Sequence, residues 1–142
     1  MTPFWWKFVL FGILGIFGEV VFTGLVDIFK NRRLRLYGFS FLWMFPIYGL
    51  LAILFPPVME RLAPYPWWSR GLCYMTGIFI VEYTTGTVLT ALTRSHIWQY
   101  NDRFNLKGQI TLLYAPVWFG VGLAVEKYYP WIEQASRVLA AL

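Results

Sequence analysis

Two glutamates are the residues of this sequence best placed to do chemistry, because each lies inside a long apolar run. Glu19 falls within residues 4–28, and Glu82 falls within residues 71–93. A charged carboxylate at the centre of a membrane helix costs on the order of 2.5–3.5 kcal/mol, and such residues are functional by default. These glutamates could bind a cation, hold a polar headgroup or carry a proton.

A structural role is the alternative for both glutamates. Each would then be protonated and hydrogen-bonded to a neighbouring helix, which contributes only about 1 kcal/mol. Thr23 and Thr85 follow the two glutamates within four residues and are candidate partners for them.

Polar and aromatic residues also gather between two apolar runs, in residues 94–108. They could line the mouth of a site, and His96 with Asp102 could form an acid–base pair. With one histidine and no serine or cysteine nucleophile at a recognisable turn, a solvated loop is the simpler interpretation. The candidate ligand-binding residues are Glu19, Thr23, Trp43, Tyr48, Glu82, Thr85, Trp98, Tyr100, Asp102, Asn105 and Trp118.

The composition predicts a membrane protein. Hydrophobic residues make up 58% of the 142 residues and charged residues 13%, against about 45–50% and about 25% in soluble proteins. One cysteine and one histidine argue against a disulfide or a histidine-rich metal site, and we expect no metal and no cofactor. The basic residues are scattered between apolar runs, which favours lipid headgroups over nucleic acid as their partners.

Four apolar stretches are long enough to cross about 30 Å of hydrocarbon as helices. The fold class is therefore all-α, because lipid offers no partners to backbone N–H and C=O groups. We expect the second helix to end at Pro56 and Pro57, and Pro46 and Pro116 to kink the second and fourth helices. The predicted membrane helices are residues 4–28, 39–55, 71–93 and 109–125.

The tail after Pro130 predicts one more short helix, over residues 131–142. Its apolar residues fall on one face, which is typical of a helix lying on the membrane surface. The alternative is that this helix docks against another subunit.

The basic residues predict the orientation of the helices. Loops 29–38 and 94–108 carry seven lysines and arginines, against five on the opposite side. The positive-inside rule then places both loops in the cytoplasm and both termini outside. The seven residues are Lys30, Arg32, Arg33, Arg35, Arg94, Arg103 and Lys107.

An internal repeat connects the two halves of the sequence. Residues 36–46 and 106–116 share the pattern L-x-G-x-x-x-L-x-x-x-P, and each leads into the second helix of a hairpin. The chain is then two tandem helical hairpins in a parallel pseudo-repeat, in which Glu19 and Glu82 face each other. Small residues on the first helix, such as Gly12 and Gly15, favour close helix contacts or a homodimer.

Several motifs resemble those of a known family. The motifs in residues 19–23, 42–49, 81–86 and 98–118 are similar to those of the vertebrate transmembrane protein 229 family. That family is grouped with bacterial proteins labelled type IV ABC transporters of the CmpB kind. The resemblance covers residues 10–127 and implies a four-helix membrane protein associated with transport.

One position departs from the family pattern. Family members usually read Trp-Asp-Tyr where this chain has Gln99 between Trp98 and Tyr100. If that aspartate is functional, either Asp102 takes over its role here or the role is absent.

The leading interpretation is a membrane protein that binds or transports a small or lipid-like ligand at a polar site between the first and third helices. The sequence contains no Gly-Lys dipeptide and therefore no phosphate-binding P-loop, so ATP hydrolysis would need an ATPase partner subunit. We expect a homodimer as the active unit. The alternatives are a membrane enzyme acting on a lipid or isoprenoid, with the glutamates as acid and base, and a scaffold subunit without a ligand.

Overall fold

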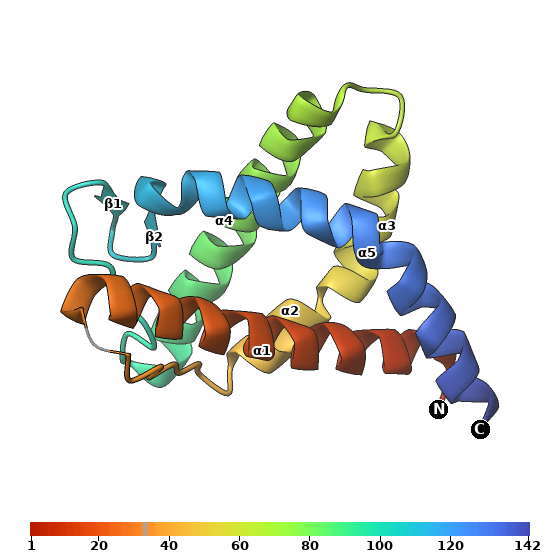
Figure 1. Cartoon of the computed structure of the whole chain (residues 1–142), viewed down its shortest axis with the longest axis horizontal. Helices are drawn as coiled ribbons and strands as arrows, with labels where there is room; N and C mark the ends of the chain where they lie inside the picture. The colour runs from red at the N-terminus through yellow and green to blue at the C-terminus, as the bar shows by residue number, and fades with distance from the viewer. Residues whose placement is uncertain (33) are drawn as a thin grey trace. The chain divides into compact units, whose positions relative to one another are not determined.

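The computed structural model describes residues 1–32 and 34–142, and it is mostly helical (Figure 1). The predicted all-α character is confirmed. Arg33, one of the seven basic residues used for the orientation, lies outside the described residues. The elements are α1 (Pro3–Asn31), α2 (Met44–Gly49), α3 (Leu51–Leu62), α4 (Trp67–Thr93), β1 (Asn105–Leu106), β2 (Ile110–Thr111), the 3₁₀ helix η1 (Leu112–Tyr114) and α5 (Ala115–Ala141).

Three helical segments of the described chain are long and apolar enough to cross a membrane: Pro3–Asn31, Met44–Leu62 and Trp67–Thr93. Only 17–28% of the residues in their most apolar windows are buried inside the protein. Large side chains such as Phe17 and Ile80 are 66% and 61% exposed. This outward apolar surface needs lipid around it, and the chain is a membrane protein.

The second apolar stretch forms a helix with different ends from those predicted. It begins at Met44 as α2, and α3 continues through Pro56 and Pro57 to Leu62, so the predicted end at the two prolines is wrong. Each proline removes only one backbone hydrogen bond, and membrane helices tolerate this loss when neighbouring groups compensate. The interruption between α2 and α3 instead lies at Leu50.

The last helix also differs from the prediction. Residues 109–114 form a turn, β2 and η1, so the helix expected from residue 109 starts at Ala115. Pro116 is the second residue of α5. An N–H group at this position would have no acceptor within the helix, so the proline removes no helical hydrogen bond and does not kink the helix. α5 then runs through Pro130 to Ala141, so the tail is not a separate helix.

The chain forms two compact units. Unit 1 comprises residues 1–58 and 130–142, and unit 2 comprises residues 59–129. In unit 1, α1 and α2 lie side by side (Figure 1). Glycines bring them together: a Cβ added at Gly12 would lie 2.7 Å from the Phe45 ring, and one at Gly49 would lie 2.6 Å from the Phe8 ring.

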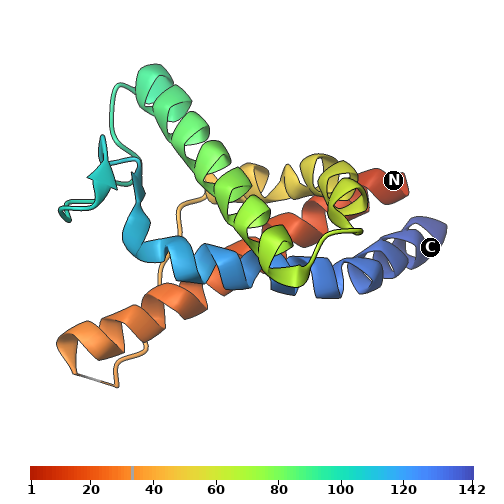
Figure 2. The same cartoon turned by 90° about the horizontal axis from the view of Figure 1, so that it is seen from above.

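Unit 2 is built on α4. The first part of α5 crosses α4 in both views (Figures 1 and 2). The Phe119 ring of α5 packs directly on Gly71 of α4. β1 and β2 form a short antiparallel hairpin with Asn105 opposite Thr111. β2 is buried and contacts α4. Within unit 2, the segment between α4 and α5 is therefore held against the side of α4, an apolar helix.

Candidate functional site

Glu82 is the most shielded carboxylate of the candidate site. It lies in α4 with only 8% of its surface exposed. The Tyr100 hydroxyl donates a hydrogen bond of 2.7 Å to Glu82 Oε1. Tyr100 is in turn held by its backbone N–H, which donates to the Gly108 carbonyl oxygen at 2.9 Å. Two of the predicted ligand-binding residues therefore meet directly.

A second contact joins the same segment to α4 through Gln109, which is 5% exposed. The Trp98 indole N–H donates to the Gln109 carbonyl oxygen at 3.0 Å, and the Gln109 amide lies 3.3 Å from both Thr90 Oγ1 and His96 Nδ1. Gly86 makes this approach possible, because a Cβ there would collide with the Gln109 side chain. The polar groups around Glu82 are thus held in place by several independent bonds.

Aromatic rings extend this network from Glu82 into α5. The Tyr100 and Tyr114 rings meet edge-on at 5.5 Å, and the Tyr114 and Trp118 rings meet edge-on at 6.4 Å. Burial, aided by the nearby carboxylates of Asp102 and Glu82, raises the pKa of the Tyr114 phenol, which keeps it neutral. The Trp118 indole N–H is shielded and has no acceptor among the described residues.

Asp102 and Asn105 serve the hairpin itself. The Asp102 carboxylate accepts from the Thr111 hydroxyl at 2.8 Å and from the Phe104 N–H at 2.9 Å. The Asn105 side chain donates to the Asp102 carbonyl oxygen and accepts from the Gly108 N–H. These bonds close a tight turn, which is a local structural role.

The acid–base pair considered for His96 and Asp102 is not formed in the described structure. His96 contacts Gln109, whereas Asp102 is bonded to Thr111. Residues 94–107 of this connecting segment are exposed or partly exposed, which fits the interpretation as a solvated loop, but the chain becomes buried directly after them. Residues 108–111 are buried, because the hairpin packs against α4.

Glu19 has its own partners in unit 1. The hydroxyls of Ser40 and Tyr48 each donate to Glu19 Oε2 at 2.9 Å. Thr23 lies one turn further along α1, where its hydroxyl accepts from the Phe39 N–H at 2.9 Å. The polar site of unit 1 therefore joins α1 to the chain that follows it, as the site of unit 2 joins α4 to its own following segment.

The remaining predicted residues do not join either network. The Thr85 hydroxyl donates to backbone carbonyl oxygens of its own helix, to that of Val81 at 2.7 Å and to that of Glu82 at 3.3 Å. Trp43 is 48% exposed and lines an open apolar groove with neighbours from its own segment. These neighbours are Leu42, Phe45 and Pro46.

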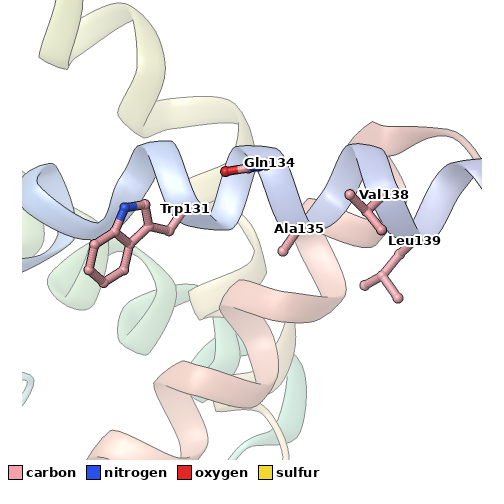
Figure 3. Close-up of a pocket in the computed structure, with 5 residues that line it drawn as sticks. All are labelled: Trp131, Gln134, Ala135, Val138 and Leu139. Carbon is pink, nitrogen blue, oxygen red and sulfur yellow. The ribbon is translucent and has the colours of Figure 1, made fainter.

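A second hollow lies on α5 (Figure 3). Its five lining residues all belong to the last turns of this helix, and none of them is ionisable. The hollow is an apolar helix face, and it brings no chemical groups together. The residues are Trp131, Gln134, Ala135, Val138 and Leu139.

Each glutamate thus accepts a phenol hydrogen bond from within its own unit, and the predicted proximity of Glu19 and Glu82 stays a prediction. Sequence reasoning missed two residues of these polar networks, Ser40 as a partner of Glu19 and Gln109 as a partner of Trp98 and Thr90. A signal was present, since both are polar residues inside the repeated L-x-G-x-x-x-L-x-x-x-P segments.

Comparison with known proteins places the chain in a family. No solved structure matches it. The model of the family described as "Putative ABC-transporter type IV", the CmpB kind, matches residues 6–141, which is nearly the whole chain. The chain therefore belongs to this family, as the resemblance of its motifs predicts.

Proposed function

We propose that the protein is a multi-pass membrane subunit of a transport system and that it binds a small or lipid-like ligand at the polar site around Glu82. The observation that carries this proposal is the shielded Glu82 carboxylate, held by the Tyr100 hydroxyl on a helix apolar enough to cross a membrane. Membership of the transporter-type family supports it.

The chemistry of the site favours a ligand with a polar head and an apolar body. The Glu82 carboxylate would attract a cationic or hydrogen-bond-donating group, and the rings of Tyr100 and Tyr114 would surround it. The shielded Trp118 N–H would donate to an acceptor on the same ligand.

The transport system would include further chains. Because the sequence has no P-loop, ATP hydrolysis would come from a partner subunit. A homodimer would enlarge the pathway for the transported ligand. The proposal therefore includes both an ATPase partner subunit and a homodimer of this chain. α5 would supply the fourth crossing through its first half, over residues 115–129.

Native mass spectrometry of the purified protein in mild detergent tests the ligand site. We expect a stoichiometric small molecule on the wild type, lost in Glu82→Gln and in Trp118→Phe. Glu60→Gln is the matched control, because Glu60 is exposed outside the site. The same spectra give the oligomeric state. If all variants and the wild type carry no ligand, the binding proposal is wrong.

A scaffold role is the second candidate, and one observation favours it. The hydrogen bonds from the Tyr100 hydroxyl to Glu82 and from the Gln109 amide to Thr90 fasten the connecting segment onto α4. In a pure scaffold, Glu82→Gln would lower thermal stability or disturb assembly without removing any bound molecule. Thermal unfolding of the samples used for mass spectrometry separates the two roles.

A further inference from the structure

The segment between α4 and α5, residues 94–114, has a basic surface that the ligand site does not use. We call this segment the connector. Arg94, Arg103 and Lys107 are all exposed on it. Arg94 follows directly after Thr93, the last residue of α4. Because α4 is long and apolar enough to cross a membrane, its end belongs at the bilayer surface, where the connector would meet lipid headgroups.

The positive charge of the connector is not neutralised from within the described chain. The three ion pairs between described residues use Lys7, Arg70 and Arg137, and none involves a connector residue. Asp102 is the only acidic residue of the connector. Its carboxylate already accepts from Thr111 and from the Phe104 N–H. The connector therefore presents cations to an outside anion.

Exposed apolar side chains alternate with these cations. Phe104 is 42% exposed and Leu106 is 53% exposed, and they lie between Arg103 and Lys107 in the sequence. The Arg103 guanidinium carbon lies 4.6 Å from the centre of the Phe104 ring. Leu112 and Leu113 add further exposed apolar surface directly after the hairpin. Basic heads beside apolar side chains suit the boundary between headgroups and acyl chains.

The hairpin holds these groups in a defined shape. Asn105 and Thr111 pair across it, and the turn between its strands places Lys107 and Gly108 at φ values of 50° and 71°. The Tyr100 N–H closes the base of the turn by donating to the Gly108 carbonyl oxygen. A preorganised basic surface loses less entropy when it binds.

We propose that the connector is a binding site for anionic phospholipid headgroups. Arg103 and Lys107 would contact the phosphate and the charged headgroup, while Phe104 and Leu106 would enter the boundary region beneath them. This site is separate from the ligand site at Glu82, since its side chains are the exposed ones of the connector.

Titration of the detergent-solubilised full chain with single lipids, followed by native mass spectrometry, tests this proposal. The probes are palmitoyl-oleoyl phosphatidylglycerol and the zwitterionic phosphatidylcholine with the same acyl chains. We expect the wild type to prefer phosphatidylglycerol. Arg103→Gln with Lys107→Gln should bind it about thirtyfold more weakly at low salt, the factor expected for two surface charges.

The matched control removes two exposed basic residues elsewhere in unit 2, Arg61→Gln with Lys127→Gln. It should keep the preference of the wild type, and phosphatidylcholine should bind all three proteins equally. Raising the salt concentration should weaken phosphatidylglycerol binding to the wild type more than to the connector variant. An unchanged affinity in the connector variant, or an equal loss in the control, would overturn the proposal and point to a protein partner for this surface.

Discussion

Glycines decide how closely the polar partners approach the two carboxylate-bearing helices. Gly86 on α4 accommodates the Gln109 side chain, and Gly15 on α1 accommodates the Tyr48 ring. Tyr48 is itself one of the residues that donate a hydrogen bond to Glu19. The missing side chains of these glycines therefore shape the polar sites, because added volume in a packed interface forces its neighbours to move.

Gly86→Ala should destabilise the protein, whereas Gly77→Ala on the same helix should not. A Cβ at Gly86 would collide with the Gln109 side chain and lie 2.9 Å from the Trp98 ring. We expect a loss of about 1–3 kcal/mol from this overpacking. Gly77 has no neighbouring atom within 4 Å, so alanine there should gain about 0.5–1 kcal/mol from helix propensity. Thermal unfolding in detergent measures both, and equal stabilities would argue against hairpin packing on α4 at Gly86.

Tyr100→Phe tests the hydrogen bond to Glu82 without changing the ring. Loss of the donor at 2.7 Å should cost about 1–3 kcal/mol, because a shielded acceptor loses its partner. Tyr65→Phe is the control, since Tyr65 is 55% exposed. Denaturant unfolding of the two variants gives the difference, and an effect no larger than that of the control would show that this bond contributes nothing to stability.

At the scale of elements, α5 continues past Pro130 because its end is anchored in unit 1. Glu133 forms an ion pair of 2.7 Å with Lys7 of α1, and Ser136 is completely buried. The two charged side chains are only 13% and 29% exposed, so water screens them less than a surface pair. Tertiary contacts thus outweigh the backbone hydrogen bond that the proline removes.

Lys7→Gln should loosen the end of α5. The partly buried pair contributes about 1–2 kcal/mol, so amide hydrogen exchange of residues 131–141 should become about tenfold faster. Lys30→Gln is the control on the same helix, because Lys30 is exposed near the end of α1. If both variants exchange at the wild-type rate, the ion pair does not hold the tail.

At the scale of the whole molecule, the number of membrane crossings decides where the termini lie. Three crossings, by the three segments that are long and apolar enough, would place the termini on opposite sides. A fourth crossing by the first half of α5 would place them on the same side. α5 has no equally apolar window among the described residues, since Glu126 and Lys127 interrupt it.

We expect four crossings, with both termini outside and the basic loops in the cytoplasm. Reporter fusions at each terminus, active on only one side of the membrane, measure this directly. Both fusions should report the outer side, as the seven basic residues against five predict. Reports from opposite sides would leave three crossings and restrict α5 to the membrane surface.

By itself, the sequence determined the helical membrane class, and it singled out two carboxylates inside apolar runs as candidates for a functional site. Apolar runs long enough to cross a bilayer must be helical, whatever packs beside them, and carboxylates such as Glu82 stand out within them. These conclusions need only local composition and spacing. The resemblance of the motifs likewise identified the family that the comparison confirms.

Only the tertiary structure decided where the helices end and which partners the glutamates have. The chain passes through Pro56 and Pro130 as helix, and after Pro130 the ion pair between Glu133 and the distant Lys7 holds the last turns of α5. Gln109 is buried because a glycine on α4, more than 20 positions earlier, leaves room for it. Such outcomes depend on non-local packing energies that no local pattern records.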